Sequence, residues 1–236
     1  MTLENARILV VGGTSGIGLA TALAARRAGA RVVVAARNED GLRRAREADA
    51  GLETRALDMM GPELAGVVED LGPLDHLVVT AADAVVGRIA DLDETRARQV
   101  LASKVWGPCR VVRAALPRLS PGGSVTLFSG AASKRASPGF ALGSAVNAAV
   151  EALAVSLAAE LAPLRVNAVR PGIIDTPVWS ERVPELRAEV FGTLLPRLSA
   201  ARAGTPGEVA EAVLYLMTSR YTTGSVLTID GGYLLL

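Results

Sequence analysis

The sequence contains very little cysteine, lysine and aromatic side chain. Of its 236 residues, one is Cys (Cys109), 3% are aromatic, and two are Lys against 23 Arg. A single cysteine excludes a disulfide within the chain and fits a reducing cytoplasm, which is the compartment we predict. We interpret Cys109 as a small helical core residue rather than a nucleophile. With so few rings, the core must consist mainly of Ala, Val and Leu.

The sequence also lacks a strong net charge and a long apolar run. Its formal net charge is +1 without a basic run, so nucleic acid and anionic membranes are not expected partners. The start, MTLENARILVVGG, does not have the pattern of a signal peptide, and no apolar run approaches the 18 residues of a membrane span. No His, Cys or carboxylate cluster has metal-ligand spacing, so no metal is expected. A small molecule is the partner that we predict.

Short β-branched runs alternate with helical segments along the whole chain. Strands are predicted at 7–11, 31–36, 53–57, 74–80, 123–128, 164–169 and 225–229. Helices are predicted at 20–28, 39–50, 62–70, 139–161 and 206–217, with one or two more within 91–118 and an irregular helical segment at 177–203. Strict alternation predicts an α/β fold: a Rossmann-like, doubly wound parallel sheet of about seven strands with helices on both faces, formed by one domain over residues 1–236.

A glycine-rich loop, VVGGTSGIGLA (10–20), joins the first predicted strand to the first predicted helix. Its first glycine can make the tight turn, its second lets the backbone approach a pyrophosphate, and its third lets helix and strand pack closely. The helix N-terminus adds free N–H groups, and two hydroxyls can add hydrogen bonds. The predicted nucleotide-binding residues of this loop are Gly12, Thr14, Ser15, Gly16, Ile17 and Gly18. The alternative, a merely flexible turn, does not account for the strand-turn-helix context.

The end of the second predicted strand determines which nucleotide is expected. An NAD site places an acid there for the ribose 2′-hydroxyl, but this strand ends Ala35-Ala36-Arg37. A guanidinium suits a 2′-phosphate, so NADP(H) is preferred over NAD(H), unless Arg37 is only a solvated surface residue. Asp58, after the third strand, is predicted to accept from the adenine amino group; the alternative is a helix cap.

Together with the glycine loop, two further segments resemble the short-chain dehydrogenase/reductase family. They are RVNAVRPGIIDTP (165–177) and the stretch from TPGEVAEAVLYLMTS to TTGSVLTIDGG (205–232), and the resemblance covers nearly the whole chain. The resemblance implies an oxidoreductase. It also implies that the nicotinamide end of the cofactor is held by Pro171, Gly172, Ile173 and Thr176. DHLVVTAA (75–82) resembles the fourth strand, and Ala81 is expected at the cofactor. Where the family usually has Asn-Asn-Ala-Gly, this chain has Val79-Thr80-Ala81-Ala82, which is expected to remove side chains that fix the turn over the cofactor.

The family's catalytic residues are an Asn, a Ser, and a Tyr followed four residues later by Lys. By local context these positions fall on Lys104, Gly130, Gly143 and Asn147, so all four have changed. The segment GFALGSAVNAAVEA (139–152), where the Tyr belongs, has one carboxylate and no group that titrates near neutral pH. The chain's tyrosines, at 215, 221 and 233, are far along the sequence.

Asn and Lys have exchanged places at two of these positions. We therefore predict that Lys104 is catalytic or binds the ribose, with Asn147 beside it, because a buried Lys can do acid–base work that Arg cannot. The alternative is a lysine at a subunit interface. Ser129, next to the lost Ser position, is a candidate for binding a carbonyl oxygen, or it only satisfies backbone at the strand end. Lys134 is interpreted as solvated and His76 as structural.

Three functions remain open at this point. The first is an NADP(H)-dependent oxidoreductase with a rearranged active site, acting on a small, fairly apolar carbonyl, alcohol, imine or alkene. The second is a nucleotide-binding protein without turnover, such as an inactive partner subunit, and the third is a non-redox enzyme such as a cyclase or dehydratase. By the resemblance, 177–203 would be a substrate lid. The helices within 91–118 and at 139–161 would form a homodimer or homotetramer interface, and the terminal Leu234-Leu235-Leu236 suits burial against a partner.

Overall fold

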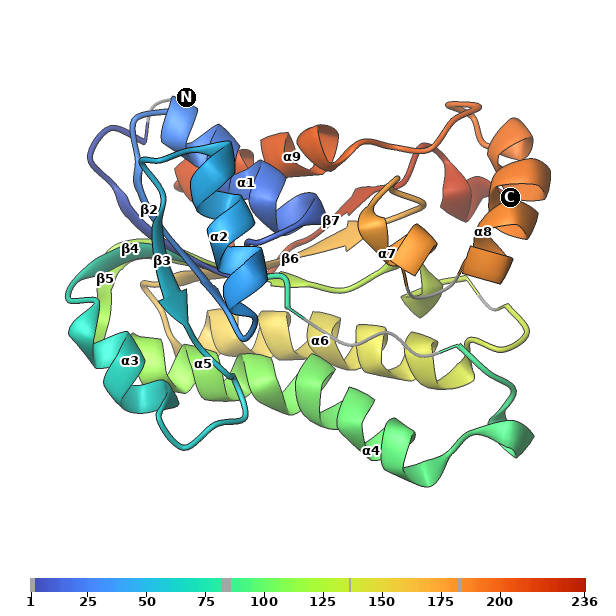
Figure 1. Ribbon diagram of the computed structural model, residues 1–236, viewed down its shortest axis with the longest axis horizontal. Helices are drawn as coiled ribbons and strands as arrows, with labels where there is room; N and C mark the ends of the chain where they lie inside the picture. Colours follow the sequence, from blue (N-terminus) through green and yellow to red (C-terminus); the bar gives the residue numbers. More distant parts are fainter. Residues whose placement is uncertain (1–2, 82–85, 136, 182–183) are drawn as a thin grey trace.

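Seven parallel strands form one twisted sheet at the centre of the molecule (Figure 1). The computed structural model describes residues 3–81, 86–135, 137–181 and 184–236. The strands are β1 (Arg7–Val11), β2 (Arg31–Ala36), β3 (Glu53–Ala56), β4 (Leu74–Val79), β5 (Leu119–Phe128), β6 (Arg165–Pro171) and β7 (Val226–Ile229). Their order across the sheet is β3-β2-β1-β4-β5-β6-β7. The predicted fold class is confirmed.

Helices cover both faces of this sheet (Figure 1). One face carries α1 (Gly16–Arg27), α2 (Glu39–Ala48) and α9 (Pro206–Thr218), and the other carries α3 (Leu64–Asp70), α5 (Gly107–Ala115) and α6 (Ala141–Glu160), with α4 (Glu94–Leu101) leading into α5. Every pair of neighbouring strands is parallel, so the chain has to cross back along the sheet, mostly through a helix, before each new strand begins. The carboxyl ends of all seven strands therefore meet at one edge.

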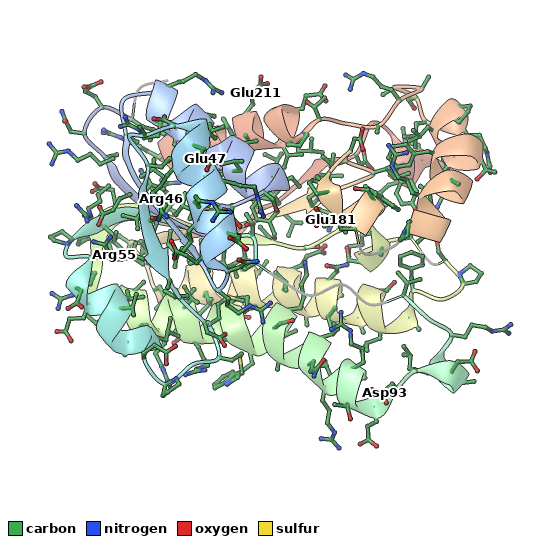
Figure 2. All side chains as sticks on the ribbon, in the orientation of Figure 1. Arg46, Glu47, Arg55, Asp93, Glu181 and Glu211 are labelled. Carbon is green, nitrogen blue, oxygen red and sulfur yellow. The ribbon has the colours of Figure 1, made fainter. Side chains whose placement is uncertain are left out.

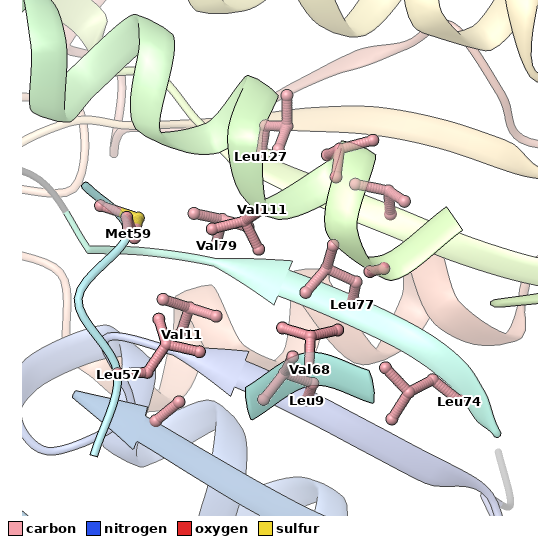
Figure 3. Packing of buried hydrophobic residues seen from close by; sticks show 14 of the residues in the cluster. Leu9, Val11, Leu57, Met59, Val68, Leu74, Leu77, Val79, Val111 and Leu127 are labelled. Atoms are coloured by element: carbon pink, nitrogen blue, oxygen red, sulfur yellow. The ribbon is translucent and has the colours of Figure 1, made fainter. Parts of the chain in front are cut away.

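The core between sheet and helices is built from small aliphatic side chains, as the composition predicts. The residues labelled in Figure 3 lie between the central strands and helices α3 and α5, and include Leu9, Val11, Leu77, Val79, Val68, Val111 and Leu127. Central strands are buried on both faces, which is why β1 and β2 are nearly continuous apolar runs rather than alternating ones.

Most element bounds differ from the sequence prediction by one or two residues, and three segments differ in a way that bears on the fold. Helix α1 begins at Gly16 rather than residue 20, so the last glycines of the loop form its first turn. Strand β5 begins at Leu119, before Pro121, because Leu119 pairs with Leu74 ahead of an irregularity in the ladder. The segment within 91–118 is α4 and α5 joined by a π-helical turn, Ala102–Trp106, and ends in a 3₁₀ turn that contains Pro117.

Helix α6 corrects the expectation that no segment approaches a membrane span. It has 20 residues and a mean hydropathy of 1.5, so by length and composition alone it could cross a bilayer. It packs against β6, and Val146, Val150 and Ala154 are buried. One such helix in an α/β fold is weak evidence for a membrane span, because core helices have the same composition.

Two short helices stand beyond the carboxyl end of β6 (Figure 1). These are α7 (Pro177–Glu181) and α8 (Pro184–Glu189), followed by a π-helical turn, Val190–Leu194, and a 3₁₀ turn, Leu195–Arg197. They occupy the segment predicted as a lid, of which residues 182–183 lie outside the described residues. Tyr233, in the final 3₁₀ turn Tyr233–Leu235, packs against a small hydrophobic cluster that includes Val190 and Leu198 of this segment.

Candidate functional site

A cleft of about 950 Å³ opens at the carboxyl edge of the sheet and runs toward α7 and α8. It includes the point between β1 and β4 where the strand order reverses, which is where open α/β sheets bind ligands. Every residue predicted for the site lines this cleft: Gly12, Thr14, Ser15, Gly16, Ile17, Gly18, Arg37, Asp58, Ala81, Lys104, Ser129, Asn147, Pro171, Gly172, Ile173 and Thr176. Residues from eight separate segments of the sequence are thus brought together.

The glycine loop leaves no room for side chains at its first and third glycines. Gly12 has φ +90°, and a Cβ there would overlap the backbone of Ala81. A Cβ on Gly18 would overlap the carbonyl of Gly12, so the helix and loop pack as closely as the motif predicts. Gly16 also has a positive φ, +51°, and begins α1. This bare backbone lies at a helix N-terminus that carries no acidic residue, so it suits a pyrophosphate.

Thr80 corrects one sequence expectation about this loop. We expected the Val79-Thr80-Ala81-Ala82 segment to lack the side chain that ties β4 to the cofactor turn. The Thr80 hydroxyl donates to the carbonyls of Gly12, at 3.0 Å, and Val11, at 3.2 Å. A threonine therefore fixes the turn in place of the expected asparagine; Ala82 lies outside the described residues.

Two unpaired guanidiniums line the end of the cleft beside β2 and α2. Arg37 follows β2, and Arg44 lies on the second turn of α2; both are exposed. The other two arginines of α2 form ion pairs: Arg43 pairs with Asp40 at 3.0 Å, and Arg46 pairs with Glu39 at 2.7 Å. Figure 2 shows Arg46 at the molecular surface. Neither cleft arginine has a carboxylate partner among the described residues, and Arg44 was not anticipated from the sequence.

Asp58 lies at the same end and already has a local role. Its Oδ1 accepts from the backbone N–H of Met60 at 2.9 Å, in the turn that follows β3. The helix-cap alternative is wrong, because the N-cap of α3 is Glu63 and Asp58 caps only the turn before it. The Asp58 carboxylate still lines the cleft, so its contact with the adenine stays a prediction.

The segment predicted to hold the nicotinamide follows β6 directly. The N–H of Gly172 donates to the carbonyl of Ile229 at 2.9 Å, and a Cβ on Gly172 would overlap Asp230. Thr176 lies opposite Gly16 of the phosphate loop. The two halves of the predicted nucleotide site therefore face each other across the cleft.

Lys104 projects into the cleft from the π-helical turn of the α4–α5 segment. Its ammonium donates to the carbonyl of Ser129 at 3.4 Å. Burial lowers the pKa of Lys104 to about 8, because the low-dielectric surroundings disfavour the charged form. Single π-helical turns are frequent at functional sites. Lys104 is thus a cation that can exchange a proton close to neutral pH.

Asn147 and Gly130 are sterically coupled. Gly130 has an extended backbone that any residue adopts, but a Cβ there would lie 3.0 Å from Nδ2 of Asn147. The amide thus lies over the position where the family's serine would project. Its Oδ1 is buried and has no hydrogen-bond partner among the described residues. An unpaired buried acceptor is costly, and a ligand hydroxyl could satisfy it.

Ser129 is directed away from a substrate-binding role. Its hydroxyl donates to Oε1 of Glu151 at 2.6 Å and accepts from the N–H of Gly130. This matches the alternative interpretation, in which Ser129 satisfies groups at the strand end. Since its carbonyl accepts from Lys104, Ser129 positions the cleft lysine rather than facing the cleft with its own hydroxyl.

A buried ion pair beneath Ser129 was not anticipated from the sequence. Arg170 donates to Oε1 of Glu151 at 2.8 Å and to Oε2 at 2.6 Å, and Ser133 also donates to this carboxylate. Burial alone would raise the pKa of Glu151, but the hydrogen bonds from Arg170, Ser129 and Ser133 outweigh it and hold the pKa at about 2. Glu151, the one carboxylate of segment 139–152, is therefore structural and charged.

Tyr233 lines the cleft although it is near the end of the chain. Arg135 donates to its carbonyl at 2.7 Å, and the Arg135 guanidinium lies 4.5 Å from the centre of its ring. In the sequence, Tyr233 is far from segment 139–152, where the family's Tyr belongs. The only signal was its place just after the final strand, whose carboxyl end shares the sheet edge with the cleft.

Three residues that the sequence predicts to be structural or solvated, His76, Lys134 and Cys109, lie where those interpretations require. His76 is buried, its Nδ1 lies 2.8 Å from the hydroxyl of Ser124, and burial lowers its pKa to about 4. Lys134 is exposed, and Cys109 is a partly buried residue of α5 whose thiol pKa is raised by burial. Within the described ranges, no three His, Cys, Asp or Glu side chains are arranged to hold a metal.

Comparisons with known proteins show which proteins this chain resembles in sequence and fold. The family model described as enoyl-(acyl carrier protein) reductase matches residues 11–234. The short-chain dehydrogenase/reductase fsr5 of Gibberella fujikuroi is 33% identical over 99% of this chain and 96% of its own length. The crystal structure of a small-chain dehydrogenase in complex with NADPH is 30% identical, with TM-score 0.85 over 99% of this chain and all of the other. The MalC reductase/Diels-Alderase from Malbranchea aurantiaca is 30% identical, with TM-score 0.89 over 99% of this chain and 98% of the other.

Proposed function

Because the chain belongs to the short-chain dehydrogenase/reductase family, we propose that it is an NADP(H)-dependent oxidoreductase acting on a small, fairly apolar carbonyl compound, alcohol or related substrate. The observation that carries this proposal is the intact nucleotide cleft: a glycine loop too close for side chains, at a free helix N-terminus, with two unpaired arginines at its end beside β2 and α2. We place the protein in the cytoplasm, on the basis of its single cysteine.

Each part of the cleft has groups suited to one part of the nucleotide. Gly12, Gly16 and Gly18, with Thr14 and Ser15, would hold the pyrophosphate, and Ile17 would pack beside it. Arg37 and Arg44 would bind the 2′-phosphate. Asp58 would accept from the adenine amino group, and Ala81 would lie at the turn that follows β4, beside the cofactor. Pro171, Gly172, Ile173 and Thr176 would hold the carboxamide end. When bound, the cofactor supplies or accepts the hydride.

Lys104 and Asn147 would provide what the lost tyrosine and lysine provide elsewhere. The Lys104 ammonium can donate a proton to the substrate oxygen or a hydrogen bond to the ribose, since its pKa of about 8 permits both forms near neutral pH. The buried Oδ1 of Asn147 can accept from a ribose hydroxyl. Ser129 would hold Lys104 in place through its carbonyl.

The glycines at 130 and 143 favour a second candidate. With no hydroxyl at either position, the cleft could bind a nucleotide without redox turnover, or serve a non-redox reaction such as cyclisation or dehydration. The similarity to a protein described as both a reductase and a Diels-Alderase is compatible with either chemistry on this fold.

Separate titrations with NADPH and NADH test the main proposal. We expect NADPH to bind and to bind more tightly than NADH, followed by NADPH oxidation with a member of a carbonyl panel. Absence of binding by either nucleotide would contradict the proposal and favour a non-redox role. Binding without oxidation of NADPH across the panel would favour a nucleotide-binding subunit.

A further inference from the structure

The scarce aromatic side chains of this protein are concentrated at the cleft. Of the eight Phe, Trp and Tyr residues in the sequence, those that line the cleft are Phe128, Phe140, Trp179 and Tyr233. A fifth, Phe191, packs edge-on against Trp179, with ring centroids 5.6 Å apart. The three others are exposed at the surface: Trp106, Tyr215 and Tyr221. Phe128 belongs to the core, whereas Trp179, Phe191 and Tyr233 pack around a small separate cluster of Ile173, Val190 and Leu198.

Trp179 is held in one orientation before any ligand binds. Its indole N–H donates to the carbonyl of Ile174 at 2.8 Å, and Phe191 supports it from the side. The guanidinium of Arg187 lies over the ring of Phe191, 4.3 Å from the ring centre. A pre-oriented indole offers a flat surface at low entropic cost.

Tyr233 is held in place by the turn that carries it and by Arg135. The carboxylate of Asp230 accepts from the N–H groups of Gly232, at 2.9 Å, and Leu234, at 3.0 Å, which holds the turn that carries Tyr233. Arg135 covers its ring and binds its carbonyl. Among the described residues its hydroxyl has no hydrogen-bond partner, so this hydroxyl is available to a ligand.

We propose that the aromatic wall of Trp179 and Tyr233, which pack against the same small cluster, binds a planar aromatic part of the substrate, and that the Tyr233 hydroxyl hydrogen-bonds to a substrate oxygen. This inference rests on the proposed function only in taking the cleft as the substrate site. Flat rings contact indole and phenol faces over a larger area than puckered rings and add a favourable quadrupole interaction. The substrate class is therefore narrowed from small carbonyl compounds to aromatic ketones or their alcohols.

Two ketones with the same carbon skeleton distinguish this proposal from general apolar binding. Acetophenone has a flat aromatic ring, and cyclohexyl methyl ketone has a puckered aliphatic one. In a Trp106→Phe protein, the remaining tryptophan is Trp179, so its emission reports ketone binding at the wall. The titrations are run with and without saturating NADP⁺, which permits no ketone reduction. A Trp179→Phe protein, which keeps the exposed Trp106, corrects for absorption and collisional quenching by the ketone.

We expect acetophenone to bind about three- to tenfold more tightly than cyclohexyl methyl ketone. Tyr233→Phe should weaken acetophenone binding by about three- to tenfold, because one hydrogen bond is lost while the ring stays. Tyr233→Leu should also reduce the preference for the aromatic ketone. Tyr221→Phe, at a fully exposed tyrosine, is the matched control and should change neither value.

Equal affinity for the two ketones, or no binding of acetophenone, would overturn the inference. Retention of both affinity and preference in Tyr233→Leu would overturn it as well. A failure of the proposed function is distinguishable: a protein that binds neither NADPH nor NADH still gives the ketone comparison without nucleotide.

Discussion

Lys104 differs from most other basic residues of this chain in residue type, and burial lowers its pKa. In a chain with 23 arginines, one of the two lysines lies in the cleft and the other, Lys134, is exposed. Arg cannot release a proton near neutral pH, whereas burial brings the pKa of Lys104 to about 8. A lysine at position 104 can therefore take part in proton transfer, which an arginine there could not do.

Replacing Lys104 should separate catalysis from nucleotide binding. We expect Lys104→Met to lower kcat for carbonyl reduction by about 10²- to 10⁴-fold, because a positioned proton donor contributes that much. In the wild type, kcat should fall as the pH rises through about 8, since the ammonium is then lost. Stopped-flow or steady-state NADPH oxidation measures both, with Lys134→Met as the control. Unchanged turnover in Lys104→Met would remove the assigned role.

The same lysine should make the protein less stable than it could be. Its pKa is about 8 when folded and 10.5 when unfolded, so below pH 8 it is charged in both states and folding bears the full cost of burying that charge. Lys104→Met should therefore raise stability at pH 7 by about 1–2 kcal/mol, or roughly 2–8 °C in Tm. This gain should shrink between pH 8 and 10.5, where wild-type folding releases the proton. Thermal melts of Lys104→Met and Lys134→Met across this range measure it, and a gain that is independent of pH would contradict it.

Arginine substitutions at the end of the cleft beside β2 and α2 should change cofactor preference. Arg37→Ala and Arg44→Ala should each weaken NADPH binding by about 10- to 100-fold and leave NADH binding nearly unchanged, because each removes a charge-assisted hydrogen bond to the 2′-phosphate. Arg43→Ala is the control on the same helix, since Arg43 already pairs with Asp40. Equal losses for the two nucleotides would place these arginines elsewhere on the cofactor.

At the scale of the element, β5, α6 and β6 are joined by one buried carboxylate. Glu151 receives hydrogen bonds from Ser129 and Ser133 after β5 and from Arg170 at the end of β6, and its side chain is 9% exposed. Because Ser129 also accepts from Lys104, the position of the cleft lysine depends on this network. The elements that carry the site are therefore fixed by a charge pair below it.

Breaking this pair should destabilise the fold in a pH-dependent way. Glu151→Gln leaves Arg170 without its counter-ion and should cost about 2–4 kcal/mol at pH 7. The folded pKa of about 2 lies below the unfolded value of 4.5, so the wild-type advantage is present above pH 4.5 and is lost as the pH falls through 2. Urea denaturation at pH 7 and pH 3 measures the difference between the two proteins. An advantage that is equal at both values would show that Glu151 acts through packing alone.

The elements and the glycine loop could be predicted from the sequence because their signals are local. Apolar runs such as RVVVAA and the spacing of Gly12, Gly16 and Gly18 depend on neighbours in the chain. The Glu151–Arg170 pair and the place of Tyr233 depend instead on which strand ends meet across the sheet. Hydrophobic periodicity does not specify such partners. The sequence also does not show that the Thr80 hydroxyl reaches the carbonyls of Val11 and Gly12, because that depends on how β1 and β4 lie in the sheet.

At the scale of the whole molecule, α6 presents a face of small side chains to solvent. The exposed apolar residues recur at helical spacing and are Ala141, Ala145, Ala148, Ala152, Val155 and Ala159. On the neighbouring α4 and π-helical turn, Leu101 is 45% exposed and Trp106 is 52% exposed. Small residues allow helices to approach closely, and an apolar helix face of this length is uncommon on the surface of a monomer. We propose that this face forms a homodimer or homotetramer interface.

A charge on that face should dissociate the assembly. Light scattering after size exclusion should give two or four times the chain mass of 24.3 kDa for the wild type. Ala148→Glu should shift this mass to that of the monomer, because the new carboxylate would be buried without a partner at the interface. Ala48→Glu, at an exposed position on α2, is the control and should leave the mass unchanged. A wild-type mass of 24.3 kDa would contradict the interface and would leave the apolar face of α6 to be explained by another partner.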